Sequence, residues 1–330
     1  MGTCPHVAKG LRRNPFRSAF FFLLIAALAL PYFTTDGSLA QSRRNGAHSS
    51  KSREAFSTAD RRLVDRAVGA VCSDRVTDPQ SSIPIDEMQT RPSLSVSHPE
   101  AVAGAHRASR LLPVAKQLVG RAILKLAQDY DVYGTPSAKA MVNAATARVE
   151  AVKRIKPDMD ARDNASVLLR EPRTIEFGTI FLASLRSDEA MISVLSHELT
   201  HIADGQADSL HPLFRAIARR AALRTGLHVT GQRAEELSCD LVGLTAAREF
   251  VGENASWEPL ARRLARAVEH NCVDDDTSDE DHLSPRNTIR ALFVLDLNSA
   301  SDIAGSDTGE LPARRRRVRS NPLSVRNSPS

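Results

Sequence analysis

The sequence predicts a mostly helical α+β protein with one small sheet. Of its 330 residues, 42% are hydrophobic and 25% are charged, proportions typical of a soluble globular chain. Apolar residues recur at helical spacing through most of the chain. Short β-rich segments are confined to residues 152–185. Together these observations exclude a disordered, a collagen-like and a polytopic membrane protein.

The N-terminus has the pattern of a secretory signal. Arg12, Arg13 and Arg17 precede an apolar run at 19–30, and a small-x-small cleavage site lies at 38–40. The run is shorter than the roughly 20 residues that a membrane-spanning helix needs. We therefore expect residues 1–40 to be a cleaved signal peptide and the mature protein to be secreted or periplasmic. The alternative is an uncleaved membrane anchor formed by residues 19–33.

The net charge of +5 is located at the two ends of the chain. Residues 1–40 carry +3 and residues 311–330 carry +6, which leaves −4 for residues 41–310. A domain that binds nucleic acid would carry its basic residues on the folded body. The sequence therefore predicts no nucleic-acid partner.

Beyond the signal, we expect four regions. They are a flexible linker at 41–56, a helical N-terminal region at 57–135, a core at 136–297 and a disordered Arg-rich tail at 298–330. Apolar spacing predicts helices at 57–72, 100–129, 137–149, 188–204, 210–225, 232–251, 257–270 and 286–297. Pro113 is expected to kink or split the second of these. Strands are expected at 167–169, 174–177 and 179–182, and the Pro- and Ser-rich segment 73–99 favours an extended loop.

The candidate chemistry lies in the H-E-x-x-H pattern at residues 197–201. His197 and His201 are one helical turn apart, so both imidazoles can reach a single Zn²⁺ at about 2.0–2.1 Å. Glu198 points about 100° away around the helix, where its carboxylate can accept a proton from an activated water. The helix itself is predicted by an apolar stripe on another face, formed by Met191, Leu195, Leu199 and Ile202.

Two histidines need a third protein ligand for zinc, and the helix expected at 232–251 offers one. Glu236 and Asp240 lie one turn apart on the same face. Glu236 can bind the metal, while Asp240 can accept a ring N–H from a ligating histidine. Glu235 is a competing ligand, although the residue one turn after it is Cys239 rather than an acid. The core-facing stripe of this helix is Leu237, Leu241 and Leu244.

The order of these segments resembles a known family. A short apolar strand at 178–183 precedes a helix that carries S-H-E-L-T-H, and E-L-S-C-D follows at 236–240. This arrangement is similar to the zinc metallopeptidases of the HtpX and CAAX prenyl endopeptidase type, gluzincins with an E-x-x-A-D motif. The resemblance covers roughly residues 140–295. It implies a zincin-like fold in which a small sheet packs on the H-E-x-x-H helix.

The resemblance also implies roles for individual residues. One zinc ion per chain would be bound by His197, His201 and Glu236, with Glu198 catalytic and Asp240 supporting a histidine. His282 would correspond to a downstream catalytic histidine of the family. The family's arginine six positions later is Thr288 here, with Arg286 and Arg290 as substitutes. An extended peptide would add to the edge strand formed by Thr179, Ile180, Phe181 and Leu182.

Three cysteines remain after removal of the signal, enough for one disulfide and one free thiol. Cys239 occupies the position of the small alanine in the family motif, which favours a buried packing role. The resemblance therefore leaves Cys72 and Cys272 as the expected disulfide.

The expected function is that of an exported zinc-dependent endopeptidase that hydrolyses a peptide or protein substrate. Contact with a membrane is compatible with this function but is not required by it. The alternative is an exported binding or scaffold protein without catalysis, in which zinc is structural or absent. Metal content and the effect of a chelator on peptide cleavage distinguish the two.

Overall fold

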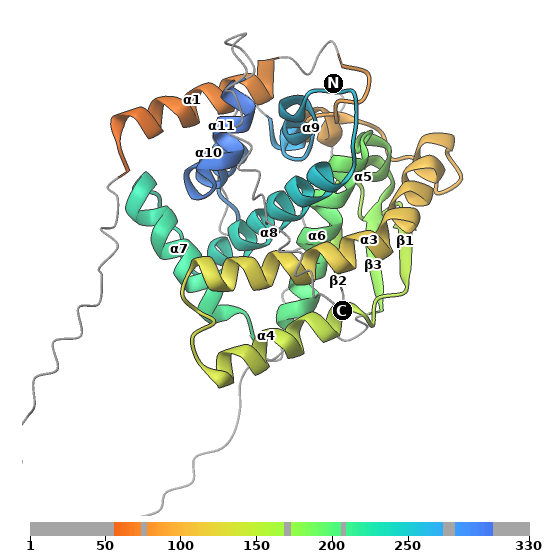
Figure 1. Ribbon diagram of the computed structural model, residues 1–330. Coiled ribbons are helices and arrows are strands. Elements are labelled where there is room, and N and C mark those ends of the chain that lie inside the picture. Colours follow the sequence, from red (N-terminus) through yellow and green to blue (C-terminus); the bar gives the residue numbers. More distant parts are fainter. Residues whose placement is uncertain (1–55, 74–77, 168–172, 206–208, 273–280, 306–330) are drawn as a thin grey trace, which may run out of the picture. The chain divides into compact units, whose positions relative to one another are not determined.

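Helix α6 (Asp188–Asp204), which carries the H-E-x-x-H segment, lies in the middle of the fold (Figure 1). The computed structural model describes residues 56–73, 78–167, 173–205, 209–272 and 281–305. The expected signal peptide, the linker up to residue 55 and the tail from residue 306 lie outside these residues. Within them, α6 packs against α8 (Gln232–Glu253), α3 (Pro99–Asp129) and α4 (Pro136–Val149). The helix is therefore enclosed by other helices on most sides.

The expected helices are present with small shifts at their ends. The described residues between 57 and 135 pack directly on the core helices and belong to the same compact unit. α3 is one helix that contains Pro113. The remaining helices are α1 (Thr58–Ser73), α2 (Ile85–Thr90), α5 (Thr179–Ser184), α7 (His211–Thr225), α9 (Leu260–Arg266), the 3₁₀ turn η3 (Glu269–Asn271), α10 (Pro285–Leu295) and α11 (Leu297–Ala304).

The sheet has three strands in the order β1-β3-β2. β1 (Arg154–Asp158) pairs parallel to β3 (Thr174–Gly178), and β2 (Ala165–Val167) pairs antiparallel to the other side of β3. β2 is therefore an edge strand, and it contacts α6. This mixed sheet among helices confirms the predicted mostly helical α+β class.

The expected strand at Thr179–Leu182 is wrong, because these residues form the buried helix α5. The amides of Ile180 and Phe181 both donate to the carbonyl of Arg162, so the chain turns away from the sheet directly after β3. α5 then lies so close to α3 that a Cβ at Gly104 would be 2.2 Å from the carbonyl oxygen of Leu182. Burial against α3 overrides the β propensity of this segment.

Three other predicted segments differ in detail from the structure. The predicted tail begins with a helix, α11, where the side chain of Asp296 accepts from the amides of Asn298 and Ser299. The loop expected at 73–99 contains the short helix α2. The helix expected at 257–270 ends at Arg266, and η3 follows. Each of these short elements is held by contacts distant in sequence, which apolar spacing does not report.

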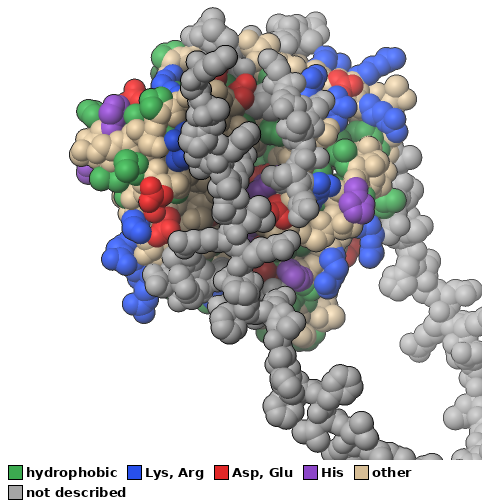
Figure 2. Space-filling model, turned by 180° about the vertical axis from the view of Figure 1, so that it is seen from behind, with side chains coloured by type: hydrophobic (Ala, Val, Ile, Leu, Met, Phe, Trp, Pro, Cys, Tyr) green, Lys and Arg blue, Asp and Glu red, His purple; other side chains and the backbone are tan. Residues whose placement is uncertain are grey.

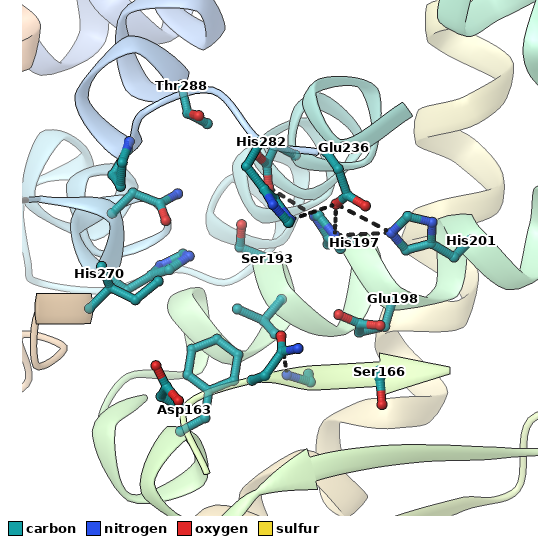
Figure 3. A pocket seen from close by; sticks show the side chains of 18 of the residues that line it. Asp163, Ser166, Ser193, His197, Glu198, His201, Glu236, His270, His282 and Thr288 are labelled. Carbon is teal, nitrogen blue, oxygen red and sulfur yellow. Dashed lines mark hydrogen bonds and ion pairs between the residues drawn. The ribbon is translucent and has the colours of Figure 1, made fainter. Parts of the chain in front are cut away.

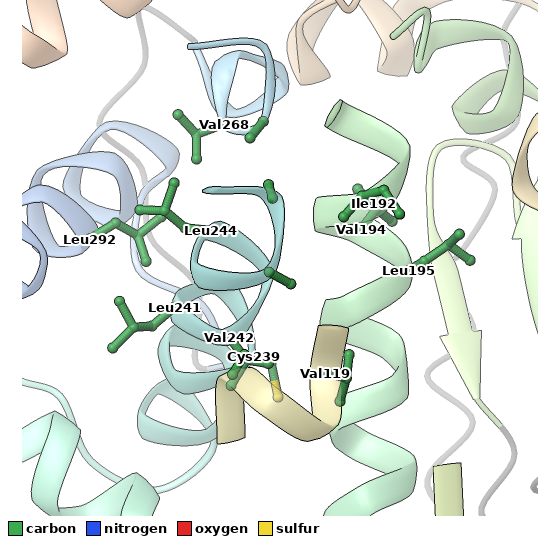
Figure 4. Close-up of a cluster of buried hydrophobic side chains, with 14 of the residues drawn as sticks. Val119, Ile192, Val194, Leu195, Cys239, Leu241, Val242, Leu244, Val268 and Leu292 are labelled. Atoms are coloured by element: carbon green, nitrogen blue, oxygen red, sulfur yellow. The ribbon is translucent and has the colours of Figure 1, made fainter. Parts of the chain in front are cut away.

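A cluster of buried hydrophobic side chains lies where α8 packs against α6 and α3 (Figure 4). A Cβ at Gly243 would lie 2.7 Å from the carbonyl oxygen of Ser193, so only glycine allows α8 to approach α6 this closely. The predicted disulfide is confirmed: Cys72 and Cys272 are bonded, with their Cα atoms 5.5 Å apart, and Cys239 is a free, buried thiol. In the described part of the chain, no helix combines the length and the apolar character that crossing a bilayer requires.

Candidate metal centre

Helix α6 presents its two histidines to a cavity because its other faces are packed. The hydroxyl of Ser187 accepts from the amide of Ala190 and caps the first turn. The predicted apolar stripe is at most 1% exposed at each of its four residues, Met191, Leu195, Leu199 and Ile202. The predicted stripe is therefore buried, and the two histidines are half-buried at the cavity.

Helix α8 brings its acidic residues to the same cavity. Its predicted core stripe, Leu237, Leu241 and Leu244, is buried as expected. Glu235, Glu236 and Asp240 line the cavity together with the histidines of α6. Two segments about 40 residues apart in the sequence thus face one another, as Figure 3 shows for the side chains of Glu236, His197 and His201.

Three donor atoms converge on one point. The Nε2 atoms of His197 and His201 are 3.2 Å apart, and Glu236 Oε2 lies 3.2 Å from the first and 3.6 Å from the second. Ligand atoms of a tetrahedral site with metal–ligand distances of about 2.0–2.1 Å are separated by about 3.3 Å. The three side chains form the single group among the described residues whose donor atoms could hold a metal ion. Both the donor types and their spacing therefore fit a divalent cation such as zinc.

Each histidine is oriented by a carboxylate behind it. His197 Nδ1 donates to Asp240 Oδ1 at 2.8 Å, as the sequence predicted for Asp240. His201 Nδ1 donates to Glu235 Oε1 at 2.8 Å. These bonds direct both Nε2 lone pairs toward Glu236 and make the rings stronger donors to a cation.

The role of Glu235 is one that the sequence analysis missed. Glu235 was considered only as a competing ligand, but it binds the ring nitrogen that faces away from the donor cluster. The available signal was its place one residue before Glu236, since α8 runs alongside both histidines and can present successive acids to them. Cys239, the residue one turn later, lies 3.8 Å from His201 Nδ1 and fills space beside this bond.

The carboxylates around His197 and His201 favour positive charge at the site, either on the rings or on a bound cation. Burial lowers the pKa of His197, but the charge and the hydrogen bond of Asp240 outweigh this, so its pKa is well above the ordinary value. Burial also acts against protonation of His201, yet Cys239, Glu235 and Glu236 raise the pKa of this ring. A proton and a metal ion would therefore compete for the same position.

Glu198 lies beside the donor cluster without joining it (Figure 3). Its side chain is buried, with 6% of the residue exposed. Burial raises the pKa of Glu198, and the neighbouring His197 and His201 act in the opposite direction. A carboxylate with a raised pKa is a stronger base than one in water.

These residues line a cavity of about 990 Å³. Residues 164–167, which include β2, form one wall, α6 and α8 form the metal end, and η3 and the start of α10 lie at the other side. Of the strand residues expected from the resemblance, only Phe181 reaches the cavity, and it does so from α5. The edge strand at this cavity is β2, which the sequence located only at Val167.

His282 lies at the cavity, close to the donor cluster. Its Nε2 is 3.8 Å from Glu236 Oε2, and its side chain is 57% exposed. Thr288 also lines the cavity, at the position where the family that the sequence resembles carries arginine. Of the two proposed substitutes, Arg290 forms an ion pair with Asp65 of α1 at 3.0 Å, and Arg286 is exposed and does not line the cavity.

His270 is a further cavity residue that the sequence gave no reason to select. It lies in η3, is 8% exposed, and faces the cavity opposite the metal end (Figure 3). Burial lowers the pKa of His270 to about 4; the charge of Asp240 opposes this shift and that of His197 adds to it. The ring is therefore neutral at physiological pH.

Comparisons with known proteins do not identify the chain. No protein-family model, no curated protein and no solved structure matches it.

Proposed function

We propose that the protein is an exported zinc endopeptidase with a zincin-like fold, similar to the HtpX and CAAX prenyl endopeptidase type. The observation that carries this proposal is the position of a buried glutamate, Glu198, next to a three-ligand set in an open cavity. Catalytic zinc sites use three protein ligands and keep a position for water or substrate, whereas structural sites are closed by four. His197, His201 and Glu236 provide three.

Different residues of the chain carry out different steps of the reaction. A zinc ion held by the three ligands supplies Lewis-acid activation of a water and of a peptide carbonyl. Glu198 accepts the proton of the attacking water on its carboxylate and passes it to the leaving amine nitrogen. His282, at the mouth of the cluster, donates a hydrogen bond to the oxygen of the carbonyl under attack.

Among the described residues, no strand pairs with the outer edge of β2, and this edge offers a place for an extended peptide. The amide of Gly178 donates to the carbonyl of Asn164, so in the alternating antiparallel ladder Ser166 is the next residue that bonds to β3. The main-chain groups of Ala165 and Val167 therefore point away from β3. The Ala165 amide bonds locally to the Asn164 side chain, which leaves the polar groups of Val167 as the main docking points.

Export is supported by the disulfide between Cys72 and Cys272, because such bonds persist in oxidising compartments. The proposed location is the periplasm or the extracellular medium, reached after removal of residues 1–40. The N-terminal residue of the mature protein tests this, since a start at Gln41 excludes an anchor.

The decisive experiment uses Glu198→Gln. This variant should retain a full equivalent of zinc and lose cleavage of a peptide library, because the proton acceptor is removed while the three ligands remain. Glu100→Gln, an exposed change on α3, is the control and should cleave as the parent does. Cleavage by Glu198→Gln at the parental rate would refute the mechanism, and parent protein without zinc would refute the metal site.

A further inference from the structure

The cavity is acidic beyond what the proposed chemistry uses. On the face seen in Figure 2, the largest groups of Lys and Arg side chains lie toward the margins. No Lys or Arg lines the cavity among the described residues. Its carboxylates are Asp86, Asp163, Glu198, Asp204, Glu235, Glu236 and Asp240.

Five of these carboxylates have a partner or a proposed task. Glu236 is a metal ligand, Glu235 and Asp240 bind the histidine rings, and Glu198 is the proposed base. Asp204 accepts from the amide of Leu210 at the end of α6. Asp86 and Asp163 remain.

Among the described residues, no cation is paired with Asp86 or Asp163. Asp86, in the first turn of α2, is exposed and accepts only from the adjacent amide of Glu87. Asp163, in the turn before β2, is half-buried, and no described cation or hydrogen-bond donor contacts its side chain. A half-buried carboxylate without a counter-ion retains part of its desolvation cost until a cation binds.

His270 provides a second, independent sign of a ligand. Neither of its ring nitrogens has a hydrogen-bond partner among the described residues, although the residue is 8% exposed and its Nδ1 is fully buried. Buried polar groups are nearly always paired, so this ring lacks a partner that a ligand could provide. Its ring centroid lies 6.3 Å from that of Phe181 in an edge-to-face arrangement. The amide of Phe181 donates to the carbonyl of Arg162, and the next residue, Asp163, lines the same cavity as the two rings (Figure 3).

The segment that carries His270 is held rigidly. The carboxylate of Glu269 accepts from the amide of Ser82 at 2.6 Å and from the hydroxyl of Ser81 at 3.0 Å. Two residues after His270, Cys272 is bonded to Cys72. A three-residue turn fixed at both ends is suited to hold a ring in one position for a ligand.

We propose that Asp163, Asp86, Phe181 and His270 form a subsite for a Lys or Arg side chain of the peptide substrate. The carboxylates pair with the guanidinium or ammonium group, and the face of Phe181 attracts the same cation. The Nε2 atom of His270, the ring nitrogen that is not fully buried, accepts one of its N–H groups. This inference rests on the proposed peptidase function and adds the class of substrate.

Binding to zinc-loaded Glu198→Gln tests the subsite without cleavage. The probes are peptides of one sequence in which a single Arg, or its neutral isostere citrulline, occupies each position in turn. At one position, Arg should bind about 10-fold or more tightly than citrulline, as expected for a charge-assisted hydrogen bond. Adding Asp163→Asn should remove this preference, and Asp86→Asn should reduce it. Asp160→Asn, an exposed neighbour outside the cavity, is the matched control and should keep it.

Two results would overturn the subsite. One is equal affinity for Arg and citrulline at every position, and the other is a preference that survives Asp163→Asn and Asp86→Asn together. Failure of the peptidase proposal gives a different result, in which the parent leaves every peptide intact while the Arg preference in binding persists.

Discussion

The two ends of the cavity differ in how far the chain satisfies its own polar groups. At the metal end, His197 and His201 each bind a carboxylate through Nδ1 and face Glu236 through Nε2. At the η3 end, His270 has no hydrogen-bond partner and Asp163 has no counter-ion among the described residues. The first end is organised for a resident cation, while the second leaves its polar groups for a transient ligand. Removing groups from each end in turn tests this difference.

The largest effect is expected from loss of a metal ligand. Glu236→Ala removes one of three donors, so zinc content should fall from one equivalent to background and peptide cleavage should disappear. Metal analysis after dialysis measures this directly. Binding of a free Arg-containing peptide at the η3 end should change much less, and a parallel loss of both would show that the two ends are not separate.

Loss of the disulfide should act mainly on stability and on the η3 end. Replacing Cys72 and Cys272 by serine should lower the free energy of unfolding by about 3–5 kcal/mol, because the bond links residues 200 apart. Urea denaturation measures the change. Zinc affinity should be nearly unchanged, since α6 and α8 carry all three ligands; a large loss of zinc affinity would contradict this division.

His270 should make the fold sensitive to acid. Its pKa of about 4 in the folded chain lies below the value of about 6.5 in the unfolded chain, so the unfolded state binds more protons between these two pH values. The contribution of His270 to the free energy of unfolding is fully present above about pH 6.5. It decreases by up to about 3 kcal/mol as the pH falls to 4. The difference between the urea midpoints measured at pH 7 and at pH 4.5 should be smaller in His270→Gln than in the parent. The exposed His106→Gln is the control, and an identical acid response of parent and His270→Gln would refute the burial argument.

The smallest effect concerns the carboxylates behind the histidines. Glu235→Gln should weaken zinc binding by about 10–100-fold, because an amide orients His201 but donates less charge to the ring. Competition with a fluorescent chelator measures the affinity. Glu253→Gln, on the exposed part of the same helix, should leave it unchanged. A zinc affinity equal to the parent's would mean that Glu235 has no role at the site.

Much of the metal end could be predicted because its chemistry is local. The four-residue spacing of His197 and His201 fixes them on one face of any helix, and the apolar stripe shows which face is buried. Glu236 was found because a site with two histidines lacks a ligand. Glu235 was misjudged, because its role depends on the angle at which α8 crosses α6, and Gly243 sets how closely the two helices approach.

Local sequence patterns do not predict the η3 end of the cavity or the full sheet. Residues 179–182 have the composition of a strand, but contact with Gly104 of α3 makes them a helix. β1 contains Pro157, which argues against a strand when the sequence is considered alone, so only its parallel pairing with β3 defines it. His270 occurs in no motif, and its place at the cavity follows from the disulfide and from Glu269.

The order of the helices, the two histidines and the glutamate between them can be predicted from the amino-acid sequence, because they follow from periodicities of a few residues. The tertiary structure alone decided which strand forms the cavity edge, which acid supports which histidine, and which side chains lie opposite the metal. The physical reason is that burial and pairing between distant segments depend on helix crossings and covalent links, and local spacing does not encode either.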